Sequence, residues 1–168
     1  GRNSKEKNLN DFIKCINLIN KQNIMINIMT NKESNEQIKN LISQNLLKKV
    51  NFYKFSNKNK ILNKIYKMTD IYISTSVYEG FPNTVAEAVN NECLVISSKS
   101  FGGCREIIKN EKYGFLYTTY DYKELFNKMN YSIKNFHLCK DKIIVAKKKL
   151  QIKAINNNSD YKNFFKSI

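Results

Sequence analysis

Glycine, proline and arginine are scarce in this chain, so the places where they occur indicate where chemistry is to be expected. Its 168 residues include five glycines and one proline. All six fall within residues 1–2, 80–82 and 102–114, and these segments also hold both arginines. The densest signal lies in and after the second segment, over residues 76–88, where two carboxylates, Glu79 and Glu87, flank Gly80 and Pro82.

The segment 76–88 has the residue types of an anion site between two hydroxyl-binding groups. Proline suits the first position of a helix, so Pro82 is expected to open one and to leave the N–H groups of residues 83–85 free to face an anion. A carboxylate is a poor partner for phosphate but a good acceptor for vicinal hydroxyls. Glu79 or Glu87 alone fits an ordinary surface acid near a helix start. Together, with the residues between them, they predict a sugar–diphosphate–ribose ligand.

The elements that must position this segment alternate along the chain. Short apolar runs predict buried strands at 24–29, 50–55, 71–74, 94–97 and 114–117. Helical spacing predicts helices over about 9–21, at 38–46 and 61–66, from Pro82, at 105–109, and from Asp121 to the end with a break near 156–158. This pattern predicts an α/β fold, a doubly wound Rossmann-like parallel sheet with helices on both faces, in which ligands bind at the carboxyl ends of the strands.

The net charge of +15 raises the question of a nucleic-acid partner. All but two of the 29 basic residues are lysines, and Lys, Asn, Ile, Tyr and Phe are the residues that AT-rich codons supply. A surface that reads bases or clamps phosphates is expected to hold several arginines. We therefore expect no nucleic-acid partner, although a basic nucleic-acid-binding module remains a rival interpretation. Contact of the basic C-terminal helices with a membrane surface stays open.

The cysteines do not predict a metal site. Cys15, Cys93, Cys104 and Cys139 lie far apart with no C-x-x-C pair, and His137 has no partners at ligand spacing. Reduced and mostly buried thiols are expected, with no metal and no cofactor. No apolar run approaches the ~20 residues that span a bilayer.

Residues 79–88 resemble the E-x7-E motif of retaining glycosyltransferases of family 4, which have the GT-B fold. Three more segments resemble the family in the same order and spacing: residues 1–2 with 6–9, 101–108, and 113–116. Two places depart from the family pattern. Residues 53–55 are bulky where the family often has a glycine after the strand, and residues 91–93 replace a turn that in the family often ends in Gly-x-Pro. Other GT-B sugar-nucleotide enzymes, epimerases or phosphorylases, are the nearest alternative.

The resemblance implies a role for each matching residue. Arg2 and Lys7 would bind the diphosphate and compensate the leaving-group charge, and Glu79 would contact the donor sugar. The resemblance also places the backbone of Phe81, Pro82 and Asn83 near the sugar hydroxyls. It implies that Thr84 binds phosphate and that Glu87 binds the ribose hydroxyls. The segment around Tyr53 would lie near the base. Arg105 has two open roles, as a surface residue paired with Glu106 or a helix end, or as a residue that reaches the donor cleft.

The resemblance also implies an architecture and an activity. Residues 1–155 would form a nucleotide-sugar-binding domain without its first strand, and 156–168 a helix that crosses to an absent N-terminal domain. The apolar stripe Tyr161, Phe164, Phe165 and Ile168 would then lack full cover. The donor would be a nucleoside-diphosphate sugar, UDP-linked, and the acceptor a glycan or a lipid-linked molecule. We expect a cytoplasmic protein, at the inner face of the membrane where lipid-linked acceptors lie, that binds donor weakly and transfers nothing alone.

Overall fold

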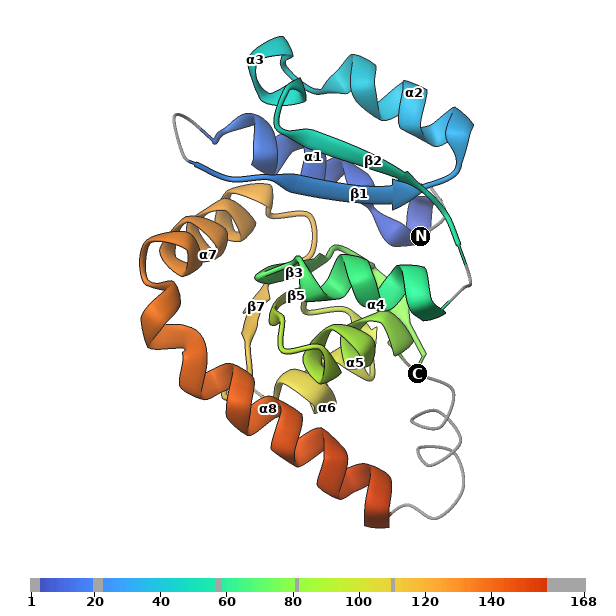
Figure 1. The fold of residues 1–168 in the computed structure, drawn as a ribbon. Helices are drawn as coiled ribbons and strands as arrows, with labels where there is room; N and C mark the ends of the chain where they lie inside the picture. The colour runs from blue at the N-terminus through green and yellow to red at the C-terminus, as the bar shows by residue number, and fades with distance from the viewer. Residues whose placement is uncertain (1–3, 20–22, 57–58, 81, 110, 157–168) are drawn as a thin grey trace.

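The computed structural model describes residues 4–19, 23–56, 59–80, 82–109 and 111–156, and these form an α/β fold with parallel strands (Figure 1). At its centre lies a three-stranded sheet in the order β3–β5–β7, built from Ile71–Ser74, Leu94–Ser98 and Phe115–Tyr117. Both neighbouring pairs are parallel, with Ile71 opposite Leu94 and Ile96 opposite Phe115. The predicted fold class is confirmed.

Alternating side chains of the central sheet build two cores on its opposite faces. Val95 of β5 and Leu116 of β7 face one cluster of buried residues, whereas Leu94 and Ile96 face another. Successive side chains in a strand point to opposite faces, and here a core covers each face, so all five residues of β5 are buried. Gly114 lets β7 begin close to β5, because a Cβ at this position would lie 2.6 Å from the Val95 carbonyl oxygen.

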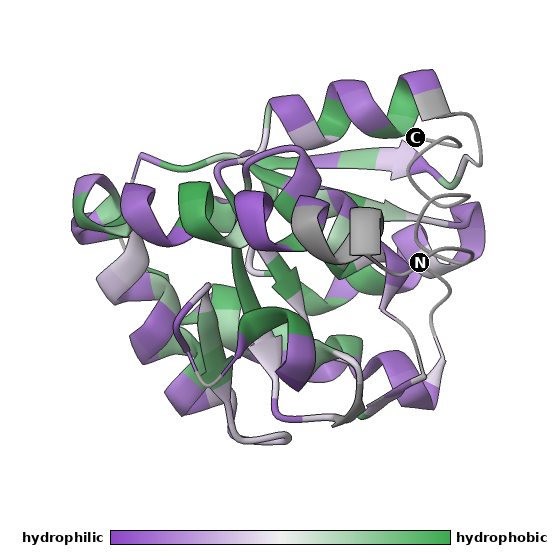
Figure 2. Ribbon diagram, turned by 90° about the horizontal axis from the view of Figure 1, so that it is seen from below, coloured by the Kyte–Doolittle hydropathy of each residue, from purple (hydrophilic) through white to green (hydrophobic). Residues whose placement is uncertain are grey.

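Helices cover both faces. One core packs α4 (Asn59–Lys67), α5 (Asn83–Asn90) and α6 (Cys104–Ile108), and the other packs α1 (Leu9–Asn17) and α7 (Tyr122–Lys134). The long α8 (Phe136–Asn156) contributes to both. Along these helices hydrophobic and hydrophilic residues alternate, whereas the strands are mostly hydrophobic (Figure 2).

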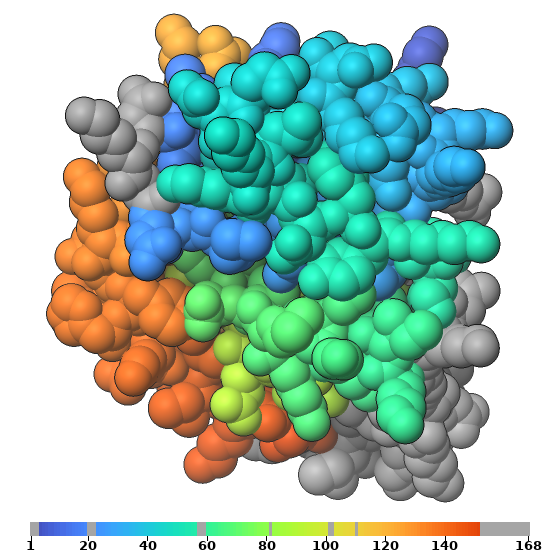
Figure 3. All heavy atoms as spheres, turned by 45° about the horizontal axis from the view of Figure 1, so that its top comes forward, coloured from blue at the N-terminus to red at the C-terminus, as the bar shows by residue number. Residues whose placement is uncertain are grey.

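A second parallel ladder joins β1 (Ile26–Thr30) to β2 (Val50–Lys54), with α2 (Lys32–Leu41) and the short α3 (Gln44–Leu47) between them in sequence. The side chain of Asn31 caps α2 by accepting a hydrogen bond from the Ser34 N–H at 2.8 Å. Isoleucines of α1, β1 and α2 form the core of this part. Its outer surface, made by α2, α3 and β2, occupies the upper part of the face in Figure 3, next to α4.

The predicted strands match the described ones within two residues, but two helix predictions were wrong. The helix expected over 38–46 is two helices, since α2 ends at Leu41 and α3 begins at Gln44. The helix expected from Asp121 to the end breaks at Asn135, whose side chain donates a hydrogen bond to the Tyr131 carbonyl at 3.0 Å and competes with the helical backbone. The tail helix predicted over 156–168, with its apolar stripe, lies outside the described residues apart from Asn156.

Candidate functional site

Two short strands bring the predicted site segment onto the glycine-rich segment. β4 (Tyr78–Glu79) pairs in parallel with β6 (Phe101–Gly102), which places Glu79 opposite Gly102. The Gly103 N–H then donates to the Gly80 carbonyl at 3.2 Å. Both strands follow the carboxyl ends of the central strands β3 and β5, where ligands bind in folds of this kind.

Gly103 is required here by close approach rather than by backbone conformation, because its φ is −66°. A Cβ at this position would lie 2.7 Å from the Pro82 Cδ atom and 3.2 Å from the Gly80 oxygen. Gly80 has no atom within 4 Å of the corresponding position. Glycine at 103 therefore allows the glycine-rich segment to lie directly against the start of α5.

The N-terminal segment is tied to the loop that follows β3. The Val77 N–H donates to the Glu6 carbonyl at 2.7 Å, and the Thr75 hydroxyl donates to the Lys7 carbonyl at 2.7 Å. Glu6 and Lys7 belong to the 3-10 helix η1 (Lys5–Lys7), and Asn8 follows it with a left-handed φ of 43°. These bonds explain how residues about 70 positions apart in the sequence come to share one site.

Lys7 and Glu79 form a two-pronged ion pair in this site. The Lys7 ammonium lies 2.8 Å from Glu79 Oε1 and 2.9 Å from Oε2. The Glu79 side chain is 15% exposed and that of Lys7 is 37% exposed, so the pair is only partly open to solvent. The structure thus brings together a cation predicted to bind diphosphate and an acid predicted to bind a sugar.

The start of α5 differs by one residue from the prediction. Pro82 is the N-cap and the helix begins at Asn83, because the Pro82 carbonyl already accepts helical bonds from the Val85 and Ala86 N–H groups at 3.0 and 3.1 Å. The expectation that the Val85 N–H is free was therefore wrong. The exposed Asn83 and Thr84 supply the first N–H groups of the helix, which have no intrahelical acceptor.

Glu87 lies one turn further along α5 and is held by a neighbouring helix. The Tyr66 hydroxyl of α4 donates to Glu87 Oε2 at 2.9 Å and approaches the Thr84 carbonyl at 3.3 Å. Burial raises the pKa of Glu87, and the Tyr66 hydrogen bond partly opposes this rise. Glu87 is thus a half-buried acid whose ionised form depends on Tyr66.

The two predicted acids belong to one short segment of the chain. Glu79 lies on β4, three residues before Pro82, the N-cap of α5, and Glu87 lies on α5 one turn after Asn83. Burial raises the pKa of Tyr72, a hydrogen bond with the Thr84 side chain lowers it, and the charges of Glu79 and Glu87 raise it further.

Three other predicted site residues lie outside this group. Arg2 and Phe81 lie outside the described residues. Tyr53 is half-buried on β2, opposite Met29, in the other ladder.

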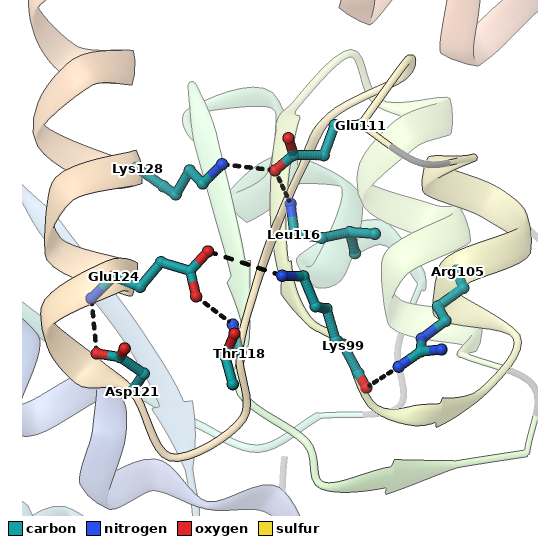
Figure 4. Close-up of polar contacts among 8 residues, drawn as sticks. All are labelled: Lys99, Arg105, Glu111, Leu116, Thr118, Asp121, Glu124 and Lys128. Carbon is teal, nitrogen blue, oxygen red and sulfur yellow. Dashed lines mark hydrogen bonds and ion pairs between the residues drawn. The ribbon is translucent and has the colours of Figure 1, made fainter.

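A second polar cluster stands on the loops after β5 and β7 (Figure 4). Glu124 accepts a hydrogen bond from the Thr118 N–H at 2.7 Å and lies 3.8 Å from the Lys99 ammonium. Asp121 caps α7 by accepting from the Glu124 N–H at 2.9 Å. The exposed Arg105 donates to the Lys99 carbonyl at 3.1 Å, which fits its surface role with a partner that was not predicted.

The cluster continues at Glu111, which accepts bonds from the Lys128 ammonium at 2.7 Å and the Leu116 N–H at 3.0 Å (Figure 4). Burial raises the pKa of Glu111, but these two hydrogen bonds and the charges of Lys128 and Lys99 together outweigh it and hold that pKa below its usual value. The carboxylate therefore stays charged and fastens the start of β7 to α7.

Three residues that position the site were missed from the sequence: Asp11, Tyr66 and Thr75. Buried Asp11 accepts bonds from the Asn8 side chain at 2.7 Å and the Tyr120 N–H at 3.0 Å, and so anchors the chain just after Lys7. Asp11 lies three residues after Asn8, a spacing that places both on one helical face and is the signal that was available.

The described part of the chain holds neither a cluster of metal-ligand residues nor a membrane-spanning helix. No group of three or more His, Cys, Asp or Glu residues there could hold a metal ion. None of the helices within it is both long enough and apolar enough to span a membrane. All four cysteines are free and buried, as predicted.

Several solved structures with this fold are of glycosyltransferases. The C-terminal domain of a glycosyl transferase group 1 family protein (LpcC) from Francisella tularensis has a TM-score of 0.79 at 22% identity, covering 91% of this chain and 82% of that one. The catalytic domain of cholesterol-alpha-glucosyltransferase from Helicobacter pylori has a TM-score of 0.72 at 23% identity, covering 89% and 92%. A TarM variant from S. aureus, in complex with Fondaparinux, alpha-GlcNAc-glycerol and UDP, has a TM-score of 0.80 at 18% identity.

The likeness covers different shares of these proteins. It takes in 99% of this chain but 33% of TarM, so the chain spans about a third of that protein. Among curated proteins, none matches the chain. The family profile described as Glycosyl transferases group 1 matches residues 1–149, most of the sequence. The chain belongs to the group 1 glycosyl transferases, with the Rossmann-like fold of a C-terminal GT-B domain.

Proposed function

We propose that this chain binds the nucleoside-diphosphate sugar donor of a retaining family 4 glycosyltransferase, with a UDP-linked sugar as donor and a glycan or a lipid-linked molecule as acceptor. The observation that carries the proposal is the placement of Lys7, Glu79 and Glu87 around the start of α5: Lys7 is bonded to Glu79 just before the helix, and Glu87 lies on its first turns. UDP is present in the TarM complex, which has the same fold and supports this choice of nucleotide.

In this proposal the diphosphate lies at the first N–H groups of α5, those of Asn83 and Thr84. A helix N-terminus favours an anion by about 0.3–2 kcal/mol. Lys7 would turn from Glu79 toward the phosphates and, together with Arg2, compensate the charge that develops as the sugar–phosphate bond breaks. No metal and no further cofactor has a role in this scheme.

The two acids take the sugars at the ends of the diphosphate. Glu79, released from Lys7, would accept hydrogen bonds from donor-sugar hydroxyls, near the backbone of Phe81 and Pro82. Glu87 would accept from the ribose hydroxyls. A hydrogen bond to a charged group contributes about 1.5–3 kcal/mol, so these contacts suffice to orient a donor. The base would lie near Tyr53, where the resemblance puts it.

The whole enzyme in this proposal has a second domain that holds the acceptor. Residues 1–155 would be the donor domain, and 156–168 would cross to the acceptor domain. We expect the isolated chain to bind donor weakly and to transfer nothing. We also propose a cytoplasmic location at the inner membrane face.

Binding experiments test the donor proposal. Isothermal titration with UDP and UDP-sugars is expected to show saturable binding at one site, whereas duplex DNA at two salt concentrations is expected to show none that is specific. Steeply salt-dependent DNA binding without nucleotide binding would overturn the proposal in favour of a nucleic-acid-binding module. Sugar transfer by the isolated chain would refute the two-domain part alone.

A further inference from the structure

A side chain outside every motif reaches the candidate site from α4. The Tyr66 ring is 8% exposed, and its hydroxyl points at the start of α5. There it donates to Glu87 Oε2 at 2.9 Å and lies 3.3 Å from the Thr84 carbonyl oxygen. A hydroxyl carries one proton, and the shorter contact is to the carboxylate, which is the stronger acceptor.

The surroundings of Tyr66 leave its ring little freedom. It packs in the same core as Val85 and Val89 of α5, and its ring lies 5.8 Å from that of Tyr72 in a tilted arrangement. The Cys93 thiol contacts the Tyr66 carbonyl at 3.4 Å. The phenol is therefore a fixed donor, rather than a side chain that meets Glu87 by chance.

The effect on Glu87 is to orient it and to favour its charged form. A glutamate side chain has several rotatable bonds, and a single hydrogen bond to Oε2 selects one arrangement and leaves Oε1 for another partner. Burial raises the pKa of Glu87, and the Tyr66 hydrogen bond works against that rise. An oriented, ionised carboxylate is what a pair of ligand hydroxyls requires.

We propose that Tyr66 is a positioning residue for nucleotide recognition, whose hydroxyl holds the Glu87 carboxylate so that its free oxygen meets the ribose hydroxyls of the donor. The proposal rests on the proposed function, in which Glu87 binds the ribose.

The test compares two probes that differ only at the ribose. UDP and 2′,3′-dideoxy-UDP are titrated into the wild-type chain and into Tyr66→Phe, which keeps the ring and removes the hydroxyl. Wild type is expected to prefer UDP by about 10-fold, the worth of one charge-assisted hydrogen bond. Tyr66→Phe is expected to reduce this preference to about 2-fold or less while the affinity for the dideoxy probe stays the same. A purely structural role would weaken both probes equally.

Two controls separate the possible failures. Tyr113→Phe removes another hydroxyl from the same core and is expected to keep the wild-type preference. In a Glu87→Gln background, Tyr66→Phe is expected to change nothing further, as a double-mutant cycle requires of one interaction. If wild type binds neither probe, the proposed function fails. If it binds both probes equally, the ribose contact of Glu87 fails, and the role of Tyr66 fails with it, while nucleotide binding stands. If wild type discriminates and Tyr66→Phe discriminates equally well, only the role of Tyr66 is overturned.

Discussion

At the scale of single residues, the candidate site pairs groups that a bound donor would separate. Lys7 contacts both oxygens of Glu79, and Glu87 contacts Tyr66, so each predicted ligand group has a protein partner in the free chain. A ligand must offer Lys7 and Glu79 replacement partners, whereas Glu87 can keep its bond to Tyr66 through Oε2 and use Oε1 for the ligand. Substitutions at these positions therefore test the ligand as well as the site.

Lys7→Met is expected to weaken UDP binding by about 10-fold, because one charge-assisted hydrogen bond to phosphate is lost. Titration calorimetry measures the change. Lys39→Met is a matched control, since the Lys39 side chain is 38% exposed and also pairs with a glutamate, Glu36, at 2.7 Å. Equal losses in both variants would point to a general charge effect and not to a site at Lys7.

Glu87→Gln is expected to separate affinity from stability. A carboxyl whose pKa is raised on folding keeps its proton in the folded state at pH values where the unfolded chain has lost it, so folding loses stability as the pH rises through that range. The glutamine variant should melt at a higher temperature than wild type at pH 7, yet bind UDP about 10-fold more weakly.

The pH dependence gives an independent check on Glu87. Wild-type affinity for UDP is expected to fall as the pH drops through the raised pKa of Glu87, because protonated Glu87 accepts hydrogen bonds poorly. In Glu87→Gln, the part of the affinity loss that comes from protonation of Glu87 should be absent. Identical pH profiles for the two proteins would remove Glu87 from nucleotide binding.

At the scale of elements, the site depends on how closely β6 approaches the start of α5. Gly103→Ala is expected to destabilise the protein by about 1–3 kcal/mol, because its Cβ would lie 2.7 Å from Pro82 Cδ and force the two segments apart. Urea unfolding measures the loss. Gly80→Ala, with open space at its Cβ, is expected to change stability by no more than about 0.5 kcal/mol.

Among the elements, the strands and the site loop could be predicted from the sequence, whereas some contacts between helices could not. The strands were predictable because a short apolar run is a local signal that can be recognised in the sequence. The loop at 79–82 was predictable because glycine and proline are scarce in this chain. Tyr66 was not, because its bond to Glu87 joins residues 21 positions apart on two different helices. The break at Asn135 was missed because helical spacing continues on both sides of it.

Another element formed despite a departure from the family pattern. The turn at 91–93 lacks the frequent glycine, yet Glu92 adopts a left-handed φ of 64° there. An ion pair from Lys147 of α8 to Glu92 at 2.6 Å lies at the same place. Tertiary contacts thus accompany a conformation that the local sequence does not favour.

At the scale of the whole molecule, the buried thiols report on global opening. Burial raises the pKa of Cys15 and Cys93 to about 12, so little thiolate exists at neutral pH and neither sulfur is open to reagents. Labelling with a thiol reagent at pH 7 is expected to be slow in the native protein and complete for all four cysteines in denaturant. Rapid labelling of any of them in the native state would contradict this burial.

The ion pair of Lys7 with both oxygens of Glu79 affects which anions the site can select. Inorganic phosphate or sulfate could bind the Lys7 ammonium only by leaving the Glu79 carboxylate, which is 15% exposed, without a partner. Such an ion has no hydroxyl that could donate a hydrogen bond to Glu79. A sugar diphosphate carries the anion and the hydroxyls on one molecule and compensates both partners at once. In the proposed function, the resting Lys7–Glu79 pair would therefore discriminate against inorganic anions.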